Sequence, residues 1–122
     1  MSACPCGGES YEACCEPLHD GARDAETASE LMRSRYSAYA IGNLNYVFRT
    51  WDPATRPPTI EPAGLEWTGL RVVDVVGGSP HDDTGIVEFV ASFRDGARDG
   101  ELHERSRFRS RRARWVYVDA ER

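Results

Sequence analysis

All four cysteines of this 122-residue chain lie in one short stretch near its start: Cys4, Cys6, Cys14 and Cys15. A Cys-x-Cys pair followed, after a short polar turn, by a Cys-Cys pair can place four thiolates around one metal ion. Gly7 and Gly8 allow the sharp bend that this requires, because glycine has no Cβ to clash. Four thiolates fill a tetrahedral coordination shell, so we predict a structural zinc site, with iron as an alternative occupant. His19 could replace a cysteine, but we interpret it as a surface side chain near a turn.

Disulfide bonds are the other use of these cysteines, and four cysteines allow three pairings in an exported protein. Residues 1–20 contain neither the basic region nor the apolar region of a signal peptide. We therefore expect a cytoplasmic protein, in a reducing compartment where thiols stay free or bind metal. The metal site is the favoured prediction, and free or paired thiols are the alternative.

Polar side chains also lie on an expected strand at residues 101–110. Alternation separates its side chains into two sets, because successive residues of a strand point to opposite faces. One set is apolar at both ends and polar in the middle: Leu102, Glu104, Ser106 and Phe108. The other set is basic: His103, Arg105, Arg107 and Arg109. The first set should face the helices, where Glu104 and Ser106 must be paired or lie in a cavity.

Glu88 poses the same question on the preceding strand, where apolar residues flank it at two-residue spacing. In a purely structural interpretation, Glu104 or Glu88 forms an ion pair with an arginine of the long helix and fixes the helix on the sheet. The available arginines are Arg33 and Arg35.

A functional interpretation is a pocket between helices and sheet, with aromatic walls and with carboxylates as anchors or as a general acid–base pair. Glu104 or Asp52 would then act as base, and a tyrosine would act as donor. The candidate catalytic residues are Glu104, Tyr36, Tyr39, Asp52 and Glu88. The candidate ligand-binding residues are Arg33, Tyr36, Trp51, Trp67, Glu104 and Ser106.

The elements that position these residues are helices first and strands afterwards. Residues 27–30 have the form of a capping box and Gly42 is a stop signal, so we predict a helix over 28–41. Asn43 should cap a second helix over 44–51, which Asp52-Pro53 ends. Residues 52–64 hold four of the seven prolines and predict an irregular loop. β-Branched and aromatic runs between turn residues predict strands over 65–76, 84–93, 101–110 and 115–119.

This order predicts an α+β fold, with helices packed on one face of a curved antiparallel sheet. We expect two units, a metal knuckle at residues 1–22 and a domain at residues 23–122.

No apolar run is long enough to span a bilayer. The net charge of -5 makes nucleic-acid binding an unfavoured function, because phosphate contacts require a basic footprint. We interpret the basic strand face as a solvated surface that pairs with acidic neighbours.

Several motifs together resemble the YchJ-like family of small bacterial proteins, which has no established reaction. Residues 4–15 are similar to a SEC-C metal knuckle. The other matching motifs are Leu31-Met32-Arg33-Ser34-Arg35-Tyr36-Ser37-Ala38-Tyr39, Thr50-Trp51, Glu66-Trp67-x-Gly69-Leu70, Val87-Glu88-Phe89-Val90-Ala91 and His103-Glu104-Arg105-Ser106-Arg107-Phe108. Together they cover nearly the whole chain.

The sequence departs from the family pattern in two places. The knuckle has one residue fewer than usual between Cys6 and Cys14, and Gly8 stands where the motif normally has serine. Asp52 stands where related sequences tend to carry histidine, so a base at that position would be a carboxylate.

The resemblance implies a nuclear-transport-factor-2-like cone with a zinc knuckle at its N-terminus. In SnoaL-like cyclases and steroid isomerases this fold encloses a ligand pocket, but it also serves non-catalytic binding and dimerisation. The similar motif of the preprotein translocase ATPase contacts a chaperone and lipid, which implies a protein partner for the knuckle.

The sequence therefore favours a zinc-knuckle binding or adaptor protein, with a protein partner at the knuckle, a small molecule in the cone, or both. The alternative is a small-molecule enzyme of the isomerase, dehydratase or cyclase type, which would transfer a proton between a pocket carboxylate and a tyrosine. We expect a monomer or a weak homodimer, because the outer sheet face, through which such cones often dimerise, carries the arginines.

Overall fold

The computed structural model describes residues 3–62 and 64–121. A single 3-10 turn at Tyr11–Ala13 and the one-turn helix α1 at Glu16–His19 lie in the knuckle. Two further helices follow, α2 at Ala28–Ile41 and α3 at Leu44–Arg49. The described chain then forms four strands: β1 at Glu66–Gly77, β2 at Thr84–Asp95, β3 at Arg98–Arg111 and β4 at Arg114–Ala120.

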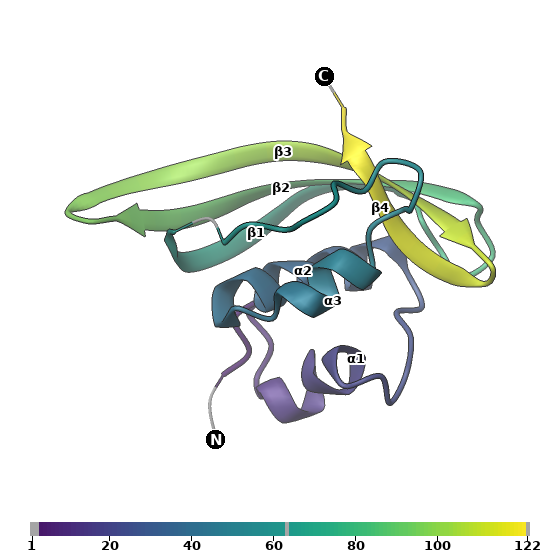
Figure 1. The fold of residues 1–122 in the computed structure, drawn as a ribbon, viewed down its shortest axis with the longest axis horizontal. Helices are drawn as coiled ribbons and strands as arrows, with labels where there is room; N and C mark the ends of the chain where they lie inside the picture. The colour runs from purple at the N-terminus through teal and green to yellow at the C-terminus, as the bar shows by residue number, and fades with distance from the viewer. Residues whose placement is uncertain (1–2, 63, 122) are drawn as a thin grey trace.

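The strands form one antiparallel sheet in the order β1-β2-β3-β4. Figure 1 shows α2 and α3 along one face of the curved sheet, with α1 and the purple N-terminal segment on the far side of these helices. The layers are thus sheet, helices and knuckle. The predicted α+β fold, a cone of helices on a curved sheet, is confirmed.

Local capping sets both ends of α2, as the sequence predicts. The Thr27 hydroxyl accepts a hydrogen bond from the Glu30 backbone N–H at 3.0 Å. The Glu30 carboxylate reaches one residue further back than a capping box requires and accepts from the Glu26 N–H at 2.8 Å. Gly42 ends the helix with a φ of 81°, in the left-handed region that favours glycine.

Helix α3 ends at Arg49, two residues before its predicted end at Trp51. Trp51 instead forms a parallel bridge with Tyr117 of β4. The Asp52 N–H donates to the Tyr117 carbonyl at 2.8 Å, and the Tyr117 N–H donates to the Thr50 carbonyl at 2.9 Å. Backbone groups of Thr50 and Asp52 that would have continued the helix therefore bond to strand β4 instead. Helix propensity alone does not predict this, because β4 is far away in the sequence.

The main core lies between α2, α3 and the inner face of the sheet. Leu31, Val47 and Val87 are completely or almost completely buried in it. Leu18 of α1 belongs to the same core cluster, although it comes from the knuckle. The knuckle therefore packs on the helices through apolar contacts as well as through its cysteines.

The basic side chains of β3 lie on the outer face of the sheet and are paired with acidic residues. Arg105 contacts the carboxylates of Asp74 and Glu88, each at 3.0 Å. Arg107 contacts Asp119 at 2.6 Å. The interpretation of this face as a solvated, charge-paired surface is confirmed. Within residues 3–62 and 64–121, no helix combines the length and the apolar character needed to cross a membrane.

Candidate metal centre and ligand pocket

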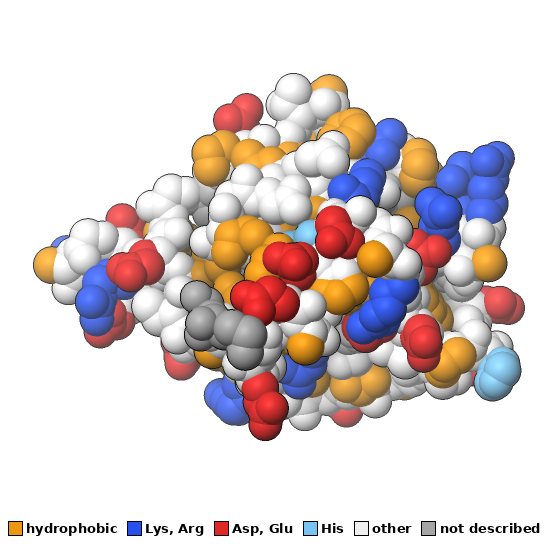
Figure 2. Space-filling model, turned by 90° about the horizontal axis from the view of Figure 1, so that it is seen from below, with side chains coloured by type: hydrophobic (Ala, Val, Ile, Leu, Met, Phe, Trp, Pro, Cys, Tyr) orange, Lys and Arg blue, Asp and Glu red, His pale blue; other side chains and the backbone are white. Residues whose placement is uncertain are grey.

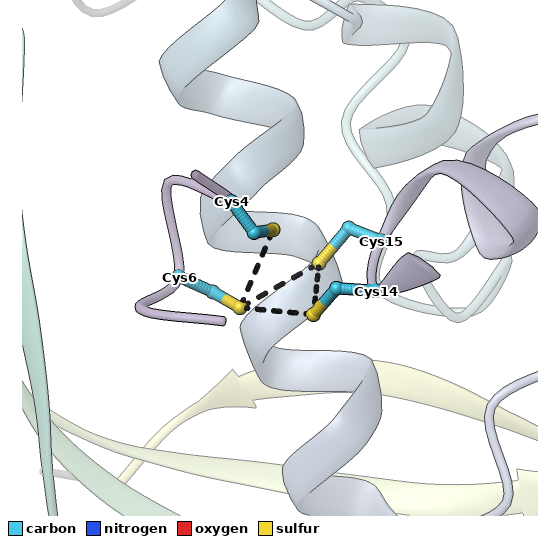
Figure 3. A group of neighbouring side chains, drawn as sticks. All are labelled: Cys4, Cys6, Cys14 and Cys15. Atoms are coloured by element: carbon cyan, nitrogen blue, oxygen red, sulfur yellow. Dashed lines mark hydrogen bonds between the residues drawn. The ribbon is translucent and has the colours of Figure 1, made fainter. Parts of the chain in front are cut away.

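The four cysteine sulfur atoms converge at the knuckle and point toward one another (Figure 3). Cys6 Sγ lies 3.5 Å from the sulfur of Cys4, 3.5 Å from that of Cys14 and 3.7 Å from that of Cys15. The sulfurs of Cys14 and Cys15 are 3.9 Å apart. All four sulfurs lie within 4.8 Å of one another.

These separations fit a tetrahedral thiolate site. A Zn–S bond of about 2.3 Å places the corners of an ideal tetrahedron about 3.8 Å apart. A disulfide would require about 2.05 Å, and all four cysteines are free thiols here. The ligand set is complete and closed, so the residues fit a structural metal ion and leave no coordination position for substrate.

Gly8 closes the turn directly against the sulfur cluster. A Cβ built on Gly8 would lie 2.8 Å from Cys14 Sγ and 3.4 Å from Cys4 Cβ. The shorter contact is closer than real Cβ atoms come, so a side chain at residue 8, such as the serine of the usual motif, would require the Cys14 sulfur to move. The loop between the two cysteine pairs is one residue shorter than usual, and it places residue 8 against Cys14. Glycine, which has no side chain, suits this position.

Helix α2 contributes the layer of contacts around the cysteines. The hydroxyl of Ser37, a completely buried residue, lies 3.5 Å from Cys4 Sγ. Arg33 Nη1 donates to the Cys6 carbonyl at 3.2 Å. Such outer contacts orient metal ligands and tune their affinity.

His19 is buried, with 5% of its surface exposed, so its interpretation as a surface residue is wrong. Its Nε2 lies 2.7 Å from the Ser34 carbonyl, which can only accept, so Nε2 carries the proton. Its Nδ1 then accepts from the Tyr11 hydroxyl at 2.7 Å. Nε2 thus joins the knuckle to α2, Nδ1 is held within the knuckle, and burial lowers the pKa of the imidazole. His19 acts as a structural link and does not join the sulfur cluster.

The pKa values of the clustered thiols are shifted in opposite directions. Hydrogen bonding from Cys15 lowers the pKa of Cys6 to about 4, against the opposing effect of burial. Burial raises the pKa of Cys14 to about 12, and the hydrogen bond to Cys6 raises the pKa of Cys15. A bound cation would replace the remaining protons, so metal binding should release protons.

A cavity of about 460 Å³, which we call the cone pocket, lies between α2 and the inner face of the sheet. From α2, the lining residues are Met32, Arg35, Tyr36 and Tyr39. From β3 they are the four residues that alternation predicts for the inner face: Leu102, Glu104, Ser106 and Phe108. The other strands and the loop after α3 complete the wall with Trp51, Glu61, Leu65, Trp67, Phe89, Ala91 and Tyr117.

Glu104 is the carboxylate in the wall of this pocket. Its Oε2 accepts from the Ser106 hydroxyl at 2.7 Å and from the Tyr117 hydroxyl at 3.5 Å. Among the described residues, no arginine or histidine forms an ion pair with Glu104. The predicted ion pair between Glu104 or Glu88 and an arginine of α2 is therefore not formed.

Arg35 lines the same pocket but its charge is engaged elsewhere. Its Nη1 donates to the Val47 carbonyl and to the Thr50 hydroxyl, both at 2.8 Å. The guanidinium carbon lies 5.1 Å from the centre of the Trp51 ring and 4.6 Å from that of Tyr117, within the range of cation–π contacts. Burial lowers the pKa of Arg35 to about 10, which leaves the group charged at neutral pH.

The predicted aromatic walls are present. Tyr36 and Trp67 meet edge to face, with ring centres 6.0 Å apart, and Trp51 meets Tyr117 in the same way at 4.9 Å. The buried Nε1–H of Trp51 has no acceptor among the described residues.

Three of the predicted site residues lie elsewhere. Glu88 is on the outer face of the sheet, where its carboxylate contacts His103 at 2.5 Å in addition to Arg105. Asp52 is buried outside the pocket wall and accepts two hydrogen bonds from Arg109, at 2.5 and 2.9 Å. Arg33 points to the knuckle. Glu104, Ser106, Tyr36, Tyr39, Trp51 and Trp67 are brought together as predicted.

Tyr117 and Arg35 are two of the pocket residues that the sequence did not assign to the site. Tyr117 lies on the last strand in an alternating pattern that is equally typical of ordinary core. Arg35 is one of fifteen basic residues, all of them arginine, so its residue type carries little information. The one available signal is that Arg35 precedes Tyr36 on an otherwise apolar side of α2.

The outer surface of the knuckle is acidic. Residues 3–22 contain four carboxylates and neither lysine nor arginine: Glu9, Glu12, Glu16 and Asp20. Seen from the knuckle side, acidic side chains gather near the middle of the molecule, next to exposed hydrophobic side chains (Figure 2).

Comparison with known proteins matches residues 27–120 to the family described as YchJ, middle NTF2-like domain. A UPF0225 protein of Streptomyces coelicolor is 49% identical over 120 residues, which cover 97% of this chain and 94% of that protein. A UPF0225 protein of Deinococcus radiodurans is 48% identical over 122 residues, covering 96% and 87%.

Two solved structures, both of SEC-C motif containing proteins, share the fold. That of Rhodopseudomonas palustris has a TM-score of 0.86 at 36% identity and covers 98% of both chains. That of Psychrobacter arcticus has a TM-score of 0.81 at 29% identity and covers 98% of this chain and 81% of the other. The cysteine knuckle, the cone of helices on a curved sheet and these matches together show that the chain belongs to the YchJ family of NTF2-like proteins with a SEC-C motif.

Proposed function

We propose that this protein is a metal-stabilised binding protein that holds a small organic ligand in the cone pocket. The observation that carries the proposal is the pocket itself, which keeps about 460 Å³ open between α2 and the sheet. Its walls are mainly apolar and aromatic, with a few polar groups that converge at Glu104, as is typical of small-molecule sites.

The metal has a structural role in this proposal. Cys4, Cys6, Cys14 and Cys15 would hold zinc, which would stabilise the turn of the knuckle against α2. Iron is the alternative occupant, because four thiolates accept either metal. The proposed location is the cytoplasm, where free thiols persist and metal can bind them.

Native mass spectrometry of protein purified without added metal tests the metal part. We expect one zinc ion per chain, lost in a Cys6→Ser variant, and the same spectra give the oligomeric state. A metal-free protein that keeps its fold and takes up no added zinc would contradict this part.

Filling the cavity tests the pocket part. Ala91 lines the pocket and is 3% exposed, so Ala91→Leu should occupy part of the cavity. Ala97 lies exposed in the turn between β2 and β3 and gives a matched control, Ala97→Leu. We expect indole, a neutral probe, to shift the NMR signals of pocket residues in the wild type and in Ala97→Leu but not in Ala91→Leu. Equal shifts in all three proteins would contradict binding in the cavity that Ala91→Leu fills.

An enzyme of the isomerase type is the second candidate, because Glu104 is a carboxylate in the pocket wall that forms no ion pair with the described residues. Glu104 would take a proton from the carbon between a ketone and a double bond, and would return it to the far carbon of that double bond. The probe 3-cyclohexenone would then isomerise to the conjugated ketone, with a rise in ultraviolet absorbance. Glu104→Gln should abolish this reaction and Glu88→Gln should leave it unchanged. A wild-type rate equal to that of buffer would exclude this chemistry for the probe.

A protein partner at the knuckle is a further part of the proposal, and its acidic surface favours a basic partner. An oligo-arginine peptide should bind at low salt, bind more weakly to a Glu12→Gln, Glu16→Gln double variant, and dissociate as salt is raised. If neither the substitutions nor the salt concentration changes the affinity for the peptide, binding through the acidic side chains is refuted.

A further inference from the structure

The cone pocket holds two opposite charges, Arg35 and Glu104, which attract each other through space but form no hydrogen-bonded ion pair. Arg35 is the one basic residue in the wall, and a carbonyl, a hydroxyl and two aromatic ring faces already engage its guanidinium. It forms no ion pair with Glu104 within the described residues. Among the described residues, the hydrogen-bond donors to the Glu104 carboxylate are the neutral hydroxyls of Ser106 and Tyr117.

The hydrogen bonds of Glu104 are unevenly distributed over its two oxygens. Ser106 and Tyr117 both donate to Oε2, whereas Oε1 has no donor among the described residues. A carboxylate accepts about four hydrogen bonds, and Glu104 Oε1 keeps solvent access, since the one buried side-chain atom without a partner among the described residues is Trp51 Nε1. Glu104 Oε1 is thus the acceptor in the pocket wall that a ligand could satisfy.

The rest of the wall suits a cation on an apolar body. Arg35 lies over the rings of Trp51 and Tyr117 and makes no cation–π contact with the other rings of the wall, which are Tyr36, Tyr39, Trp67, Phe89 and Phe108. Aromatic faces attract ammonium groups, and a charge-assisted hydrogen bond to a carboxylate is about twice as strong as a neutral one. Glu61, the other carboxylate of the wall, adds negative potential at an exposed position.

We infer that the ligand of the cone pocket is an organic amine, with a protonated nitrogen that donates to Glu104 and a flat apolar body that packs among the aromatic rings. This inference rests on the proposed function, because it names the class of ligand for the same pocket. The Glu104 carboxylate would repel an anionic ligand. A neutral alcohol would donate a hydrogen bond to Glu104 that is weaker than the bond from an ammonium group.

Three indole compounds that differ only in the end group test this inference. Tryptamine carries an ammonium group, tryptophol a hydroxyl and indole-3-propionate a carboxylate. Their dissociation constants are measured at neutral pH from NMR shifts of pocket residues in the metal-loaded full chain. We expect tryptamine to bind with a dissociation constant of about 1 mM or lower, about tenfold more tightly than tryptophol, with indole-3-propionate weakest.

Two carboxylate variants identify the group responsible. Glu104→Gln should bring tryptamine to the affinity of tryptophol, whereas Glu88→Gln, on the outer face, should leave the tenfold preference unchanged. If wild-type protein binds tryptophol or indole-3-propionate as tightly as tryptamine, the amine class is refuted while the pocket function stands. If none of the three compounds binds, and indole also fails to bind, both the inference and the proposed function fall.

Discussion

Replacing Gly8 by alanine should weaken metal binding much more than it weakens the metal-free fold. The new Cβ would lie 2.8 Å from Cys14 Sγ. In the metal-free protein, the half-exposed Cys14 side chain can rotate away from the new methyl group. In the metal-bound protein, the same sulfur is held as a ligand, so the contact must be relieved by distorting the site.

The expected cost follows from the cost of inserting one methyl group into a packed site, about 1–3 kcal/mol. Because every 1.4 kcal/mol is a factor of ten, the zinc dissociation constant should rise by about 5- to 150-fold. The unfolding temperature of the metal-free protein should change little, since Cys14 relaxes there.

Competition with a chromophoric zinc chelator measures the affinity, and circular dichroism on heating measures the stability with and without metal. Gly69→Ala is the matched control, because a Cβ at Gly69 meets no atom within 4 Å. Zinc affinity that is unchanged in Gly8→Ala, or an equal loss of stability in the metal-free and metal-bound forms, would refute the reasoning.

Three further predictions concern stability and metal affinity. Asp52→Asn should lower the free energy of unfolding by about 1–2 kcal/mol at neutral pH, because it breaks the two-bonded ion pair with Arg109. The Arg109 guanidinium lowers the pKa of Asp52, so this stabilisation is complete above the ordinary carboxyl pKa of about 4 and is lost as the pH falls through the lowered value. Ser37→Ala should raise the zinc dissociation constant by about tenfold, since its hydroxyl contacts Cys4. Leu31→Ala should cost about 2–5 kcal/mol in urea unfolding, because Leu31 is 2% exposed in the core.

Each of these changes has a control of the same chemistry. Asp95→Asn removes an exposed carboxylate and should leave unfolding curves unchanged at neutral and at acidic pH. Ser92→Ala, remote from the cysteines, should keep the zinc affinity. Leu102→Ala, at a residue that is 40% exposed, should cost less than half as much as Leu31→Ala. If a variant and its control give equal effects, the contact assigned to that residue is not the cause.

The fold was largely predictable because local signals and the global arrangement agree along most of this chain. Thr27 and Gly42 mark both ends of α2 by capping chemistry that depends only on neighbouring residues. The four strands are separated by turn residues, and the inner face of β3 follows from the apolar residues at its two ends. The end of α3 was missed because it depends on Tyr117, which lies far away in the sequence.

Strand β2 shows where alternation fails. Ile86 and Val90 flank Glu88 and suggest that Glu88 shares a buried face, but Val87 and Phe89 are apolar as well. The structure turns Val87 and Phe89 inward and Glu88 outward. Because both faces of this strand are apolar, the choice depends on the pairing of Glu88 with Arg105 of β3, which the sequence of β2 does not contain.

The sulfur cluster could be predicted from the sequence more fully than the pocket wall, because its residues are neighbours in the chain. Cys4, Cys6, Cys14 and Cys15 are neighbours in sequence, so their spacing was enough to predict their convergence. Glu104 and Tyr117 meet only through the pairing of β3 with β4, and Arg35 reaches the pocket from α2. The partners of a pocket residue are fixed by three-dimensional packing, which one sequence does not specify.

Helix α2 contacts the knuckle through Arg33 and Ser37 and lines the pocket through Arg35 and Tyr36. When one helix contributes to two sites, a ligand that shifts the position of the helix at one site also changes the binding affinity at the other site. Linkage is reciprocal, so any increase in pocket affinity caused by metal must be matched by an equal increase in metal affinity caused by the pocket ligand. The metal content of the purified protein would then report the occupancy of a pocket on the other side of the helix.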